Sequence, residues 1–265
     1  RLSLVGSEMC IRDRYIMFNR TLTTILGIIC LLTFSLSEDK FSSFRELKKI
    51  SNGMSIIHSS DSKVGIIAIH GFYPAYWVGI HHEWVQPFNY LVENGINTFF
   101  YKYDWNDCPS SVAVDFNKEL NDLINKYPNI DQWQVVGHSM GGTVVLFSIL
   151  NSKLNENIVY NIVATALHMD IDKVPMTTRM SIEKRFKKCP DNLNSFDEVF
   201  SKGFKNKLVQ WRNIKEFDSQ FKKYDFDPYD KEIKNSIVVQ FPDSLNGERV
   251  GHTSSLYFAI LEIVN

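Results

Sequence analysis

The chain has 265 residues, a formal net charge of -1 and 44% hydrophobic residues. This apolar content excludes an intrinsically disordered chain, and the near-zero charge argues against a nucleic-acid partner, which would require a basic surface. A chain of this length can bury one sizeable core, so we expect a single globular domain.

The N-terminal residues precede that domain. Residues 1–16 resemble a translated adapter sequence more than natural protein, so they are left out of the fold prediction. From there a short basic stretch with Arg20 leads into an apolar run (22–36) and then into small and polar residues. This pattern is typical of a signal peptide, here residues 17–37, and the run is short for a membrane span.

Cleavage near residues 35–38 would make this a secreted or secretory-pathway protein, with an uncleaved N-terminal anchor as the alternative. The remaining domain, residues 38–265, keeps Cys108 and Cys189. In an oxidising compartment these two cysteines could pair, but two unpaired thiols are equally compatible with the sequence.

Hydrophobic patterning predicts strands that alternate with helices. Continuous apolar or β-branched runs predict strands, and apolar residues at helical spacing, bounded by serine, glycine or proline, predict helices. In chain order the strands are 63–72, 96–105, 133–137, 157–167, 206–214 and 235–241, and the helices are 82–95, 110–128, 141–152 and 253–264. This order predicts an α/β fold with a mostly parallel central sheet and helices on both faces.

Ligands in such sheets gather at the carboxyl ends of the strands. His70, Asp104, Ser139 and His168 all stand near such ends. We therefore expect the functional site along this one edge of the sheet.

The regular alternation stops at residues 169–205, which are polar, charged and helix-prone. We interpret this segment as a helical insertion over the carboxyl edge of the sheet that could act as a lid. An ordinary crossover helix between two strands is the alternative.

The stretch Gly137-His138-Ser139-Met140-Gly141 matches the G-x-S-x-G pattern of a nucleophile elbow. A serine on a tight strand-to-helix turn needs neighbours without side chains two residues away on each side. An apolar strand precedes this motif and an apolar helix follows it, which is the context that the motif requires. We predict Ser139 as a nucleophile and the Met140 amide as one donor of an oxyanion hole.

A serine nucleophile needs a base and an acid that orients the base, in the chain order serine, acid, histidine for this topology. His252 lies after the last strand and just before the last helix, so we predict it as the base. We predict Asp218, on the loop after the strand 206–214, as the acid. The alternatives for the acid are Glu216, Asp170, Asp172 and Asp243.

The end of the first predicted strand supplies the second half of the oxyanion hole. We predict the Phe72 amide as the second donor, with His70 as a residue that hydrogen-bonds this loop. The residues expected in or beside the substrate pocket are His70, Tyr73, His138 and His168, with Tyr76 and Trp77 available to line an apolar acyl site.

His70-Gly71-Phe72, Tyr103-Asp104-Trp105 and the stretch 137–142 together resemble the α/β-hydrolase superfamily. The sequence is most similar to compact lipases and lipase-like serine esterases, including the GPI inositol-deacylase type. The resemblance runs from Val64 to the C-terminus and is specific over residues 64–150. It implies the fold and the roles of serine, base and oxyanion donors given above.

One stretch departs from the family pattern. Those lipases often carry Thr-Pro-His-x-Gly after the strand that follows the elbow, whereas residues 164–170 here retain only His168. The pocket beside the nucleophile therefore differs from that of the lipases.

Other motifs indicate no cofactor and no metal. The sequence contains no G-x-G-x-x-G, P-loop or H-E-x-x-H pattern. The acidic stretch 225–230 lacks the glycine and closing glutamate of an EF-hand, so we interpret it as a solvated loop.

The sequence thus predicts a serine hydrolase that cleaves carboxylic esters, with a small-molecule ester or lipid as substrate, no nucleic-acid partner and transient contact with a lipid surface. A thioesterase or amidase with the same triad is one alternative. A non-catalytic binding protein on a hydrolase scaffold is another.

Overall fold

The structure is a computed structural model that describes residues 44–72, 78–151, 157–168, 170–174, 176, 179–180, 189 and 207–265. The predicted signal peptide, the adapter-like residues, Tyr73, Tyr76 and Trp77 lie outside the described residues, as does most of the predicted insertion 169–205. Residues 43–265 form one compact unit.

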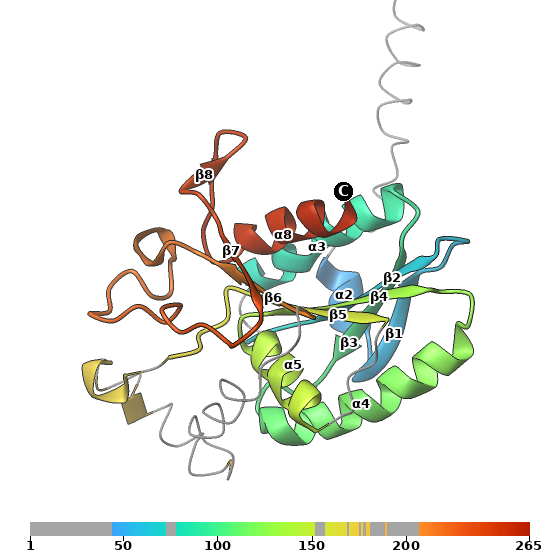
Figure 1. Ribbon diagram of the computed structural model, residues 1–265, viewed down its shortest axis with the longest axis horizontal. Coiled ribbons are helices and arrows are strands. Elements are labelled where there is room, and N and C mark those ends of the chain that lie inside the picture. Colours follow the sequence, from blue (N-terminus) through green and yellow to red (C-terminus); the bar gives the residue numbers. More distant parts are fainter. Residues whose placement is uncertain are drawn as a thin grey trace, which may run out of the picture. The chain divides into compact units, whose positions relative to one another are not determined.

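A seven-stranded sheet runs through the centre of this unit (Figure 1). Its strands, in spatial order, are β1 (Gly53–His58), β3 (Asn97–Lys102), β2 (Val64–Ile69), β4 (Gln132–His138), β5 (Ile158–Val163), β6 (Leu208–Arg212) and β7 (Ile237–Gln240). The strand β1 pairs antiparallel with β3, and every other pair is parallel. The predicted mostly parallel sheet is therefore confirmed.

Helices cover both faces of the sheet, as predicted. Figure 1 shows α3 (Val78–Glu93) and α8 (Ser254–Val264) together on one face, with α4 (Pro109–Lys126) and α5 (Met140–Leu150) on the other. The short helix α2 (Phe44–Lys49) packs against α3. Because both faces are covered, the central strand β2 carries no polar side chain and is buried at five of its six positions.

The register of the inner strands sets the position of the functional edge. Ile69 of β2 pairs with Gly137 of β4, and His138 pairs with Val163 of β5. The strands β2, β4 and β5 therefore end side by side, and the loops that follow them meet at one edge. The main hydrophobic core lies between these strands and the helices α4 and α5.

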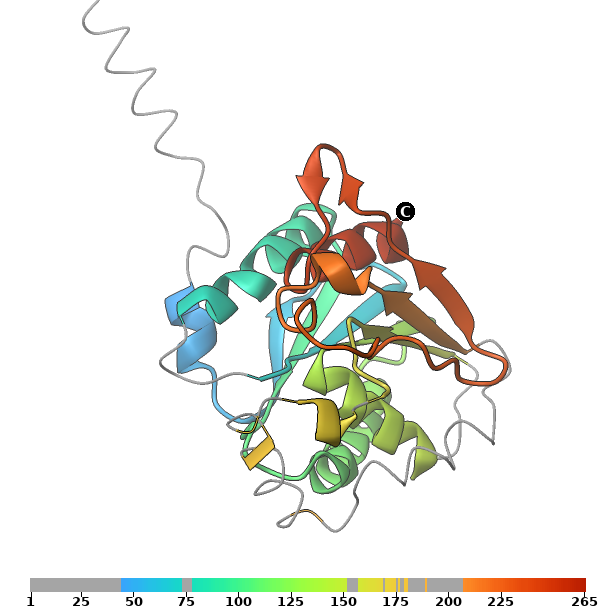
Figure 2. The ribbon, with the colours of Figure 1, turned by 90° about the vertical axis from the view of Figure 1, so that its left-hand side faces the viewer.

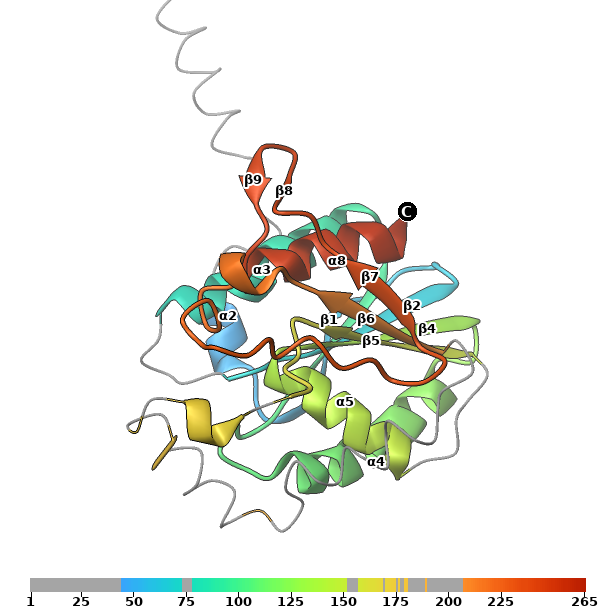
Figure 3. The same ribbon diagram turned by 60° about the vertical axis from the view of Figure 1, so that its left-hand side comes forward.

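The short helix α2, the edge strand β1 and a small hairpin are among the elements that were not predicted. The edge strand β1 is only half-buried, so it lacks the continuous apolar run of a central strand. A hairpin of β8 (Ser244–Leu245) and β9 (Glu248–Arg249) turns at Asn246-Gly247, where both residues have positive φ (52° and 81°). Asn-Gly is the dipeptide that such tight hairpin turns favour. Figure 3 shows this hairpin projecting from the rest of the unit.

A disulfide joins Cys108, just before α4, to Cys189 in the segment between β5 and β6. The two Cα atoms are 5.4 Å apart, within the range that a disulfide spans. The cysteines, whose pairing the sequence left open, are therefore bonded across 81 residues of chain.

Candidate active site

Ser139 occupies a sharp turn between β4 and α5. Its backbone has φ 53° and ψ -120°, which residues with a side chain rarely adopt. A Cβ atom at Gly137 would lie 2.5 Å from the carbonyl oxygen of Gly141, and one at Gly141 would lie 2.3 Å from that of Ile69. Both positions must therefore be glycine for this turn to form.

The turn lies directly against the end of β2. A Cβ atom at Gly71 would lie 3.0 Å from Cβ of Ser139 and 3.3 Å from the amide nitrogen of Met140. Met140 opens α5, where amide groups have no acceptor within the helix. The next residue after Gly71 is Phe72, whose ring packs edge-on against Trp105 with centroids 4.4 Å apart. The loop after β2 and the start of α5 therefore flank Ser139.

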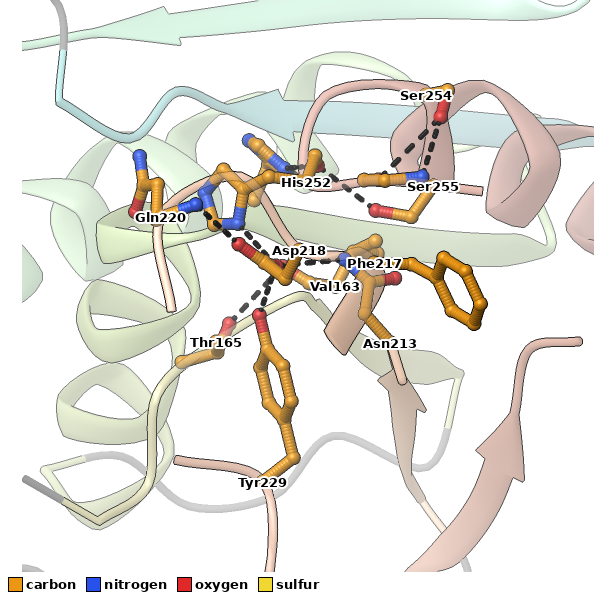
Figure 4. A network of polar contacts seen from close by, with 12 residues as sticks. Val163, Thr165, Asn213, Phe217, Asp218, Gln220, Tyr229, His252, Ser254 and Ser255 are labelled. Atoms are coloured by element: carbon orange, nitrogen blue, oxygen red, sulfur yellow. Dashed lines mark hydrogen bonds and ion pairs between the residues drawn. The ribbon is translucent and has the colours of Figure 1, made fainter. Parts of the chain in front are cut away.

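His252 and Asp218 meet from two different loops. Asp218 directly follows the single turn η2 (Lys215–Phe217), and His252 lies two residues before α8. Figure 2 shows η2 in orange beside the start of α8 in red. The Nδ1–H of His252 donates to Oδ2 of Asp218 at 2.9 Å (Figure 4). The His252 Nε2 is buried and makes no hydrogen bond within the described residues, which suits an atom that must accept a proton from a substrate-facing group.

Asp218 is fully buried and accepts three further hydrogen bonds (Figure 4). The Tyr229 hydroxyl donates to Oδ2 at 2.6 Å, Nδ2 of Asn213 donates to Oδ2 at 3.0 Å, and the Gln220 amide donates to Oδ1 at 2.8 Å. Burial alone would favour the neutral acid, but the hydrogen bond and charge of His252, with the bonds from Tyr229 and Asn213, lower the pKa of Asp218 well below its usual value. The group is therefore a fixed carboxylate at neutral pH.

His138, the residue before Ser139, makes a second set of buried contacts. Its Nδ1 forms an ion pair with Oε1 of Glu83, which comes from α3. Its Nε2 lies 2.8 Å from the backbone carbonyl oxygen of His252. Because both ring nitrogens are engaged inside the protein and the side chain is fully buried, the prediction that His138 binds substrate is wrong.

Part of the chain is similar to a known family. The sequence profile of the family described as lipase (class 3) matches residues 44–167, a range that includes Ser139 and ends before Asp218 and His252. No curated protein matches the chain.

Two solved structures share the fold. Esterase B from Lactobacillus rhamnosis is 13% identical, with 91% of this chain and 93% of that chain covered and a TM-score of 0.52. The α/β-hydrolase MGS-MChE2, from a metagenome of sediments of the lagoon of Mar Chica in Morocco, is 11% identical, with 82% and 94% covered and a TM-score of 0.50. The chain therefore has the α/β-hydrolase fold, and its residues 44–167 are similar to the lipase (class 3) family.

His70 is a structural residue of the loop after β2. Its ring stacks on Tyr103 with centroids 4.2 Å apart. Its Nδ1–H donates to the Gly71 carbonyl at 2.8 Å, and its Nε2 accepts from the Tyr103 amide at 3.1 Å. Burial lowers the pKa of His70 to about 4, so the ring is neutral at pH 7. The predicted hydrogen bonding of the loop is confirmed, whereas the predicted contact with substrate is wrong because the side chain is fully buried.

The other acids considered as partners of His252 do not contact it. Glu216 is exposed and its carboxylate lies 3.8 Å from Nζ of Lys215, and Asp243 is exposed and accepts a hydrogen bond from Ser244.

The carboxylates of Asp170 and Asp172 pair with basic side chains instead. Asp170 lies 3.2 Å from Lys173, and Asp172 lies 3.0 Å from Arg179. Among the candidates, only Asp218 contacts the imidazole.

His168 follows β5 and is half-buried. Its ring packs edge-on against Phe226 at 5.8 Å, and its amide donates to the carbonyl oxygen of Pro228 at 3.2 Å. The structure therefore places His168 against the loop 225–230. Tyr73, the last predicted pocket residue, lies outside the described residues.

Sequence reasoning missed three residues of the candidate site: Tyr229, Asn213 and Glu83. Tyr229 belongs to the stretch 225–230, which was predicted to be solvated, yet Tyr229 is buried. The mixture of aromatic and acidic residues in that stretch was a usable signal, because buried tyrosines need a polar partner. Nothing in the sequence links Glu83 to His138, which lies 55 positions away on another element.

Two features are absent from the part of the chain that the structure describes. The described residues contain no group of three or more His, Cys, Asp or Glu side chains placed to hold a metal ion. None of their helices is both long enough and apolar enough to cross a bilayer.

Proposed function

We propose that this hydrolase cleaves carboxylic esters, in particular lipid or acyl esters, through a triad of Ser139, His252 and Asp218. The observation that carries the proposal is the buried bond between His252 Nδ1 and Asp218, which leaves Nε2 without a partner. This pair and the strained turn of Ser139 belong to loops at the same edge of the sheet. A carboxylate, an oriented imidazole and a serine at a tight turn are the parts that acyl transfer to serine requires.

The reaction proceeds in two halves. The Ser139 oxygen attacks the ester carbonyl carbon while its proton passes to Nε2 of His252. The amides of Phe72 and Met140 donate to the carbonyl oxygen as it becomes negative. The ester C–O bond then breaks, the alcohol leaves with the proton from Nε2, and an acyl-serine remains. Water attacks this acyl-serine by the same steps and releases the carboxylic acid.

Asp218 has an electrostatic role in both halves. Each proton transfer to Nε2 leaves a positive imidazolium at His252 for the lifetime of the tetrahedral intermediate. A carboxylate 2.9 Å away stabilises that charge and keeps the proton on Nδ1, so that Nε2 faces the reaction. The low pKa of Asp218 keeps the carboxylate ionised throughout.

Two observations support an acyl or lipid ester as the substrate. The family profile that matches the chain is that of a lipase. Esterase B, which shares the fold, is known in a form inhibited by a C4-C4 SN3 tributyrin phosphonate. We therefore propose short-chain glycerol and alkyl esters as the first substrates to test.

Labelling with a fluorophosphonate and turnover of p-nitrophenyl butyrate test the proposal. We expect the wild-type chain to react with both, and Ser139→Ala to lose labelling and to lower kcat on the order of 10⁶-fold. The matched control is Ser111→Ala, at an exposed position of α4, which should behave as wild type. Labelling that persists in Ser139→Ala would refute the nucleophile.

A series of butyryl substrates tests the class of bond. We expect tributyrin and the butyrate ester to be hydrolysed faster than a butyryl amide or thioester of the same size. A preference for the amide or thioester would replace the proposed ester substrate. A folded chain with no turnover and no labelling would favour a binding protein.

We also propose that the protein enters the secretory pathway. The disulfide between Cys108 and Cys189 supports this, because disulfides persist mainly in oxidising compartments. Expression of residues 17–265 in a secreting host should deliver into the medium a protein whose first residue lies between residues 35 and 38. Retention of the whole chain in the membrane fraction would favour the anchor instead.

A further inference from the structure

His138 lies between two hydrogen-bond acceptors. Its Nε2 is 2.8 Å from the backbone carbonyl oxygen of His252, which can only accept. Its Nδ1 is paired with a carboxylate oxygen of Glu83, which also accepts when ionised. The side chains of His138 and Glu83 are at least nine-tenths buried, so water does not substitute for either contact.

The two contacts together require an additional proton. A neutral imidazole has one N–H group and can satisfy only one of two acceptors. With two N–H groups, the imidazolium of His138 donates to both, and the Glu83 carboxylate balances its charge. In the alternative form, Glu83 is the protonated, neutral carboxyl, and its O–H group donates to Nδ1 of a neutral His138. In both forms the pair contains one proton more than a neutral histidine beside an ionised glutamate.

We propose that Glu83 and His138 form a buried positioning pair that retains this proton and holds the backbone of His252, the base of the proposed triad. The inference rests on the proposed function, since it assigns His252 to proton transfer. The imidazole of His252 is oriented from one side by Asp218, through Nδ1. The backbone of the same residue is held by His138 and by Ser255 Oγ, which donates to the same carbonyl oxygen at 3.0 Å.

The charges around His138 are compatible with a retained proton. From α3, Glu83 is the paired carboxylate, and from the loop after β6, the ionised Asp218 adds a second negative charge. The ring of His252 lies 4.9 Å from that of His138, and the neutral His70 is the other buried imidazole near Glu83. Burial alone would lower the pKa of His138, but the charge and hydrogen bond of Glu83 outweigh it, and the net effect is a raised pKa.

This arrangement links a helix on the surface of the sheet to the catalytic edge. Glu83 comes from α3, His138 ends β4 and stands next to Ser139, and His252 precedes α8. A shift of His252 by a fraction of an ångström would move Nε2 relative to the serine. Displacements of about 1 Å can lower turnover on the order of 100-fold, so the contact is expected to affect kcat more than KM.

Three variants separate the role of the hydrogen bond from that of the charge. His138→Phe removes the donor to His252, and we expect kcat to fall on the order of 10- to 100-fold with KM nearly unchanged. His138→Gln can keep a donor near Nε2 and should recover part of that loss. Glu83→Gln replaces the carboxylate with an amide that can donate to Nδ1, so a neutral His138 satisfies both neighbours.

The pH profile of kcat distinguishes positioning by the pair from a general loss of stability. In the wild type, kcat should fall on the alkaline side, where the pair releases its proton and one contact of His138 is lost. In Glu83→Gln this fall should shift to higher pH, because the neutral pair needs no extra proton. The matched control is Glu119→Gln, which loosens the contact of α4 with the Met54 amide in β1 and should leave the profile unchanged.

Nitrogen-15 NMR of the histidines gives a readout that does not depend on activity. At neutral pH we expect both nitrogens of His138 to be protonated in the wild type and only one in Glu83→Gln. A wild-type His138 with one proton beside an ionised Glu83, or a His138→Phe with wild-type kcat and pH profile, would overturn the inference. If Ser139→Ala remained active, the proposed function would fail, whereas the NMR result would still report on the pair.

Discussion

The carboxylate of Asp218 lies 2.9 Å from Nδ1 of His252, although 34 positions separate the two residues in the chain. The strand β7, the hairpin β8–β9 and the loop 225–230 all intervene. The relationship therefore depends on how the loops after β6 and β7 return to the same edge of the sheet.

Asp218→Asn should lower kcat on the order of 10³- to 10⁴-fold, because an amide neither balances an imidazolium nor holds the proton on Nδ1. Turnover of p-nitrophenyl butyrate at neutral pH measures the effect. The control is Asp243→Asn, at the exposed alternative acid, which should retain wild-type kcat. The opposite ranking of the two variants would transfer the role of the acid to Asp243.

Tyr229→Phe removes one of the donors that hold Asp218 ionised. The lowered pKa of Asp218 contributes stability that is present above the pKa of the unfolded chain and is lost as the pH falls through the folded value. With one donor fewer, the folded pKa rises and the acid-side loss of stability becomes smaller. At neutral pH we expect the variant to be less stable by about 1–3 kcal/mol.

Urea unfolding of Tyr229→Phe and the wild type between pH 3 and pH 7 measures this difference. Tyr224→Phe is a suitable control, since Tyr224 belongs to the same loop and its ring stacks on Phe226. Equal stability of Tyr229→Phe and wild type at every pH would show that the hydroxyl does not stabilise the carboxylate.

His70 should make the fold sensitive to mild acid. An unfolded histidine takes up a proton near pH 6.5, whereas His70 does so only at about pH 4. Between these values the unfolded chain binds more protons, so lowering the pH favours unfolding, by about 3 kcal/mol over the whole interval. The stability from neutral His70 is fully present above pH 6.5.

His70→Phe keeps a ring against Tyr103 but cannot titrate. We expect this variant to be less stable than wild type at pH 7, because two buried hydrogen bonds are lost, and to show a shallower decline between pH 6.5 and pH 4. His58→Gln, at a half-buried histidine of the edge strand β1, should leave the slope unchanged. An unchanged slope in His70→Phe would assign the acid sensitivity to other groups.

The disulfide between Cys108 and Cys189 should stabilise the fold by restricting the unfolded chain across 81 residues. Replacement of both cysteines by serine is expected to lower the free energy of unfolding by about 2–4 kcal/mol. Thermal unfolding of the variant and of the wild type, each with and without a thiol reductant, tests this. A reductant that lowers the stability of the variant as much as that of the wild type would contradict the prediction.

The alternating elements and the turn at Ser139 followed from sequence alone because their causes are local. A buried parallel strand must be apolar on both faces, and β2 and β4 read as such runs. A cramped turn excludes side chains at Gly137 and Gly141, and that exclusion is visible in the residue types. The half-buried strand β1 lacked any such signature, since an edge strand needs neither a continuous apolar run nor strict alternation.

The order of serine, acid and histidine limited the candidate acids to five carboxylates, and only the tertiary structure shows that Asp218 is the one in contact with His252. Which carboxylate lies beside the imidazole depends on burial and on hydrogen-bond donors from distant positions, such as Tyr229 and Asn213. Sequence spacing does not encode these contacts. The same is true of Glu83 and His138, whose shared proton exists only because folding places two acceptors around one imidazole away from water. The sequence by itself determined the fold and the position of the proposed nucleophile through local sterics and hydrophobicity. Only the packing of loops that are distant in the chain decided which ionisable side chains come into contact.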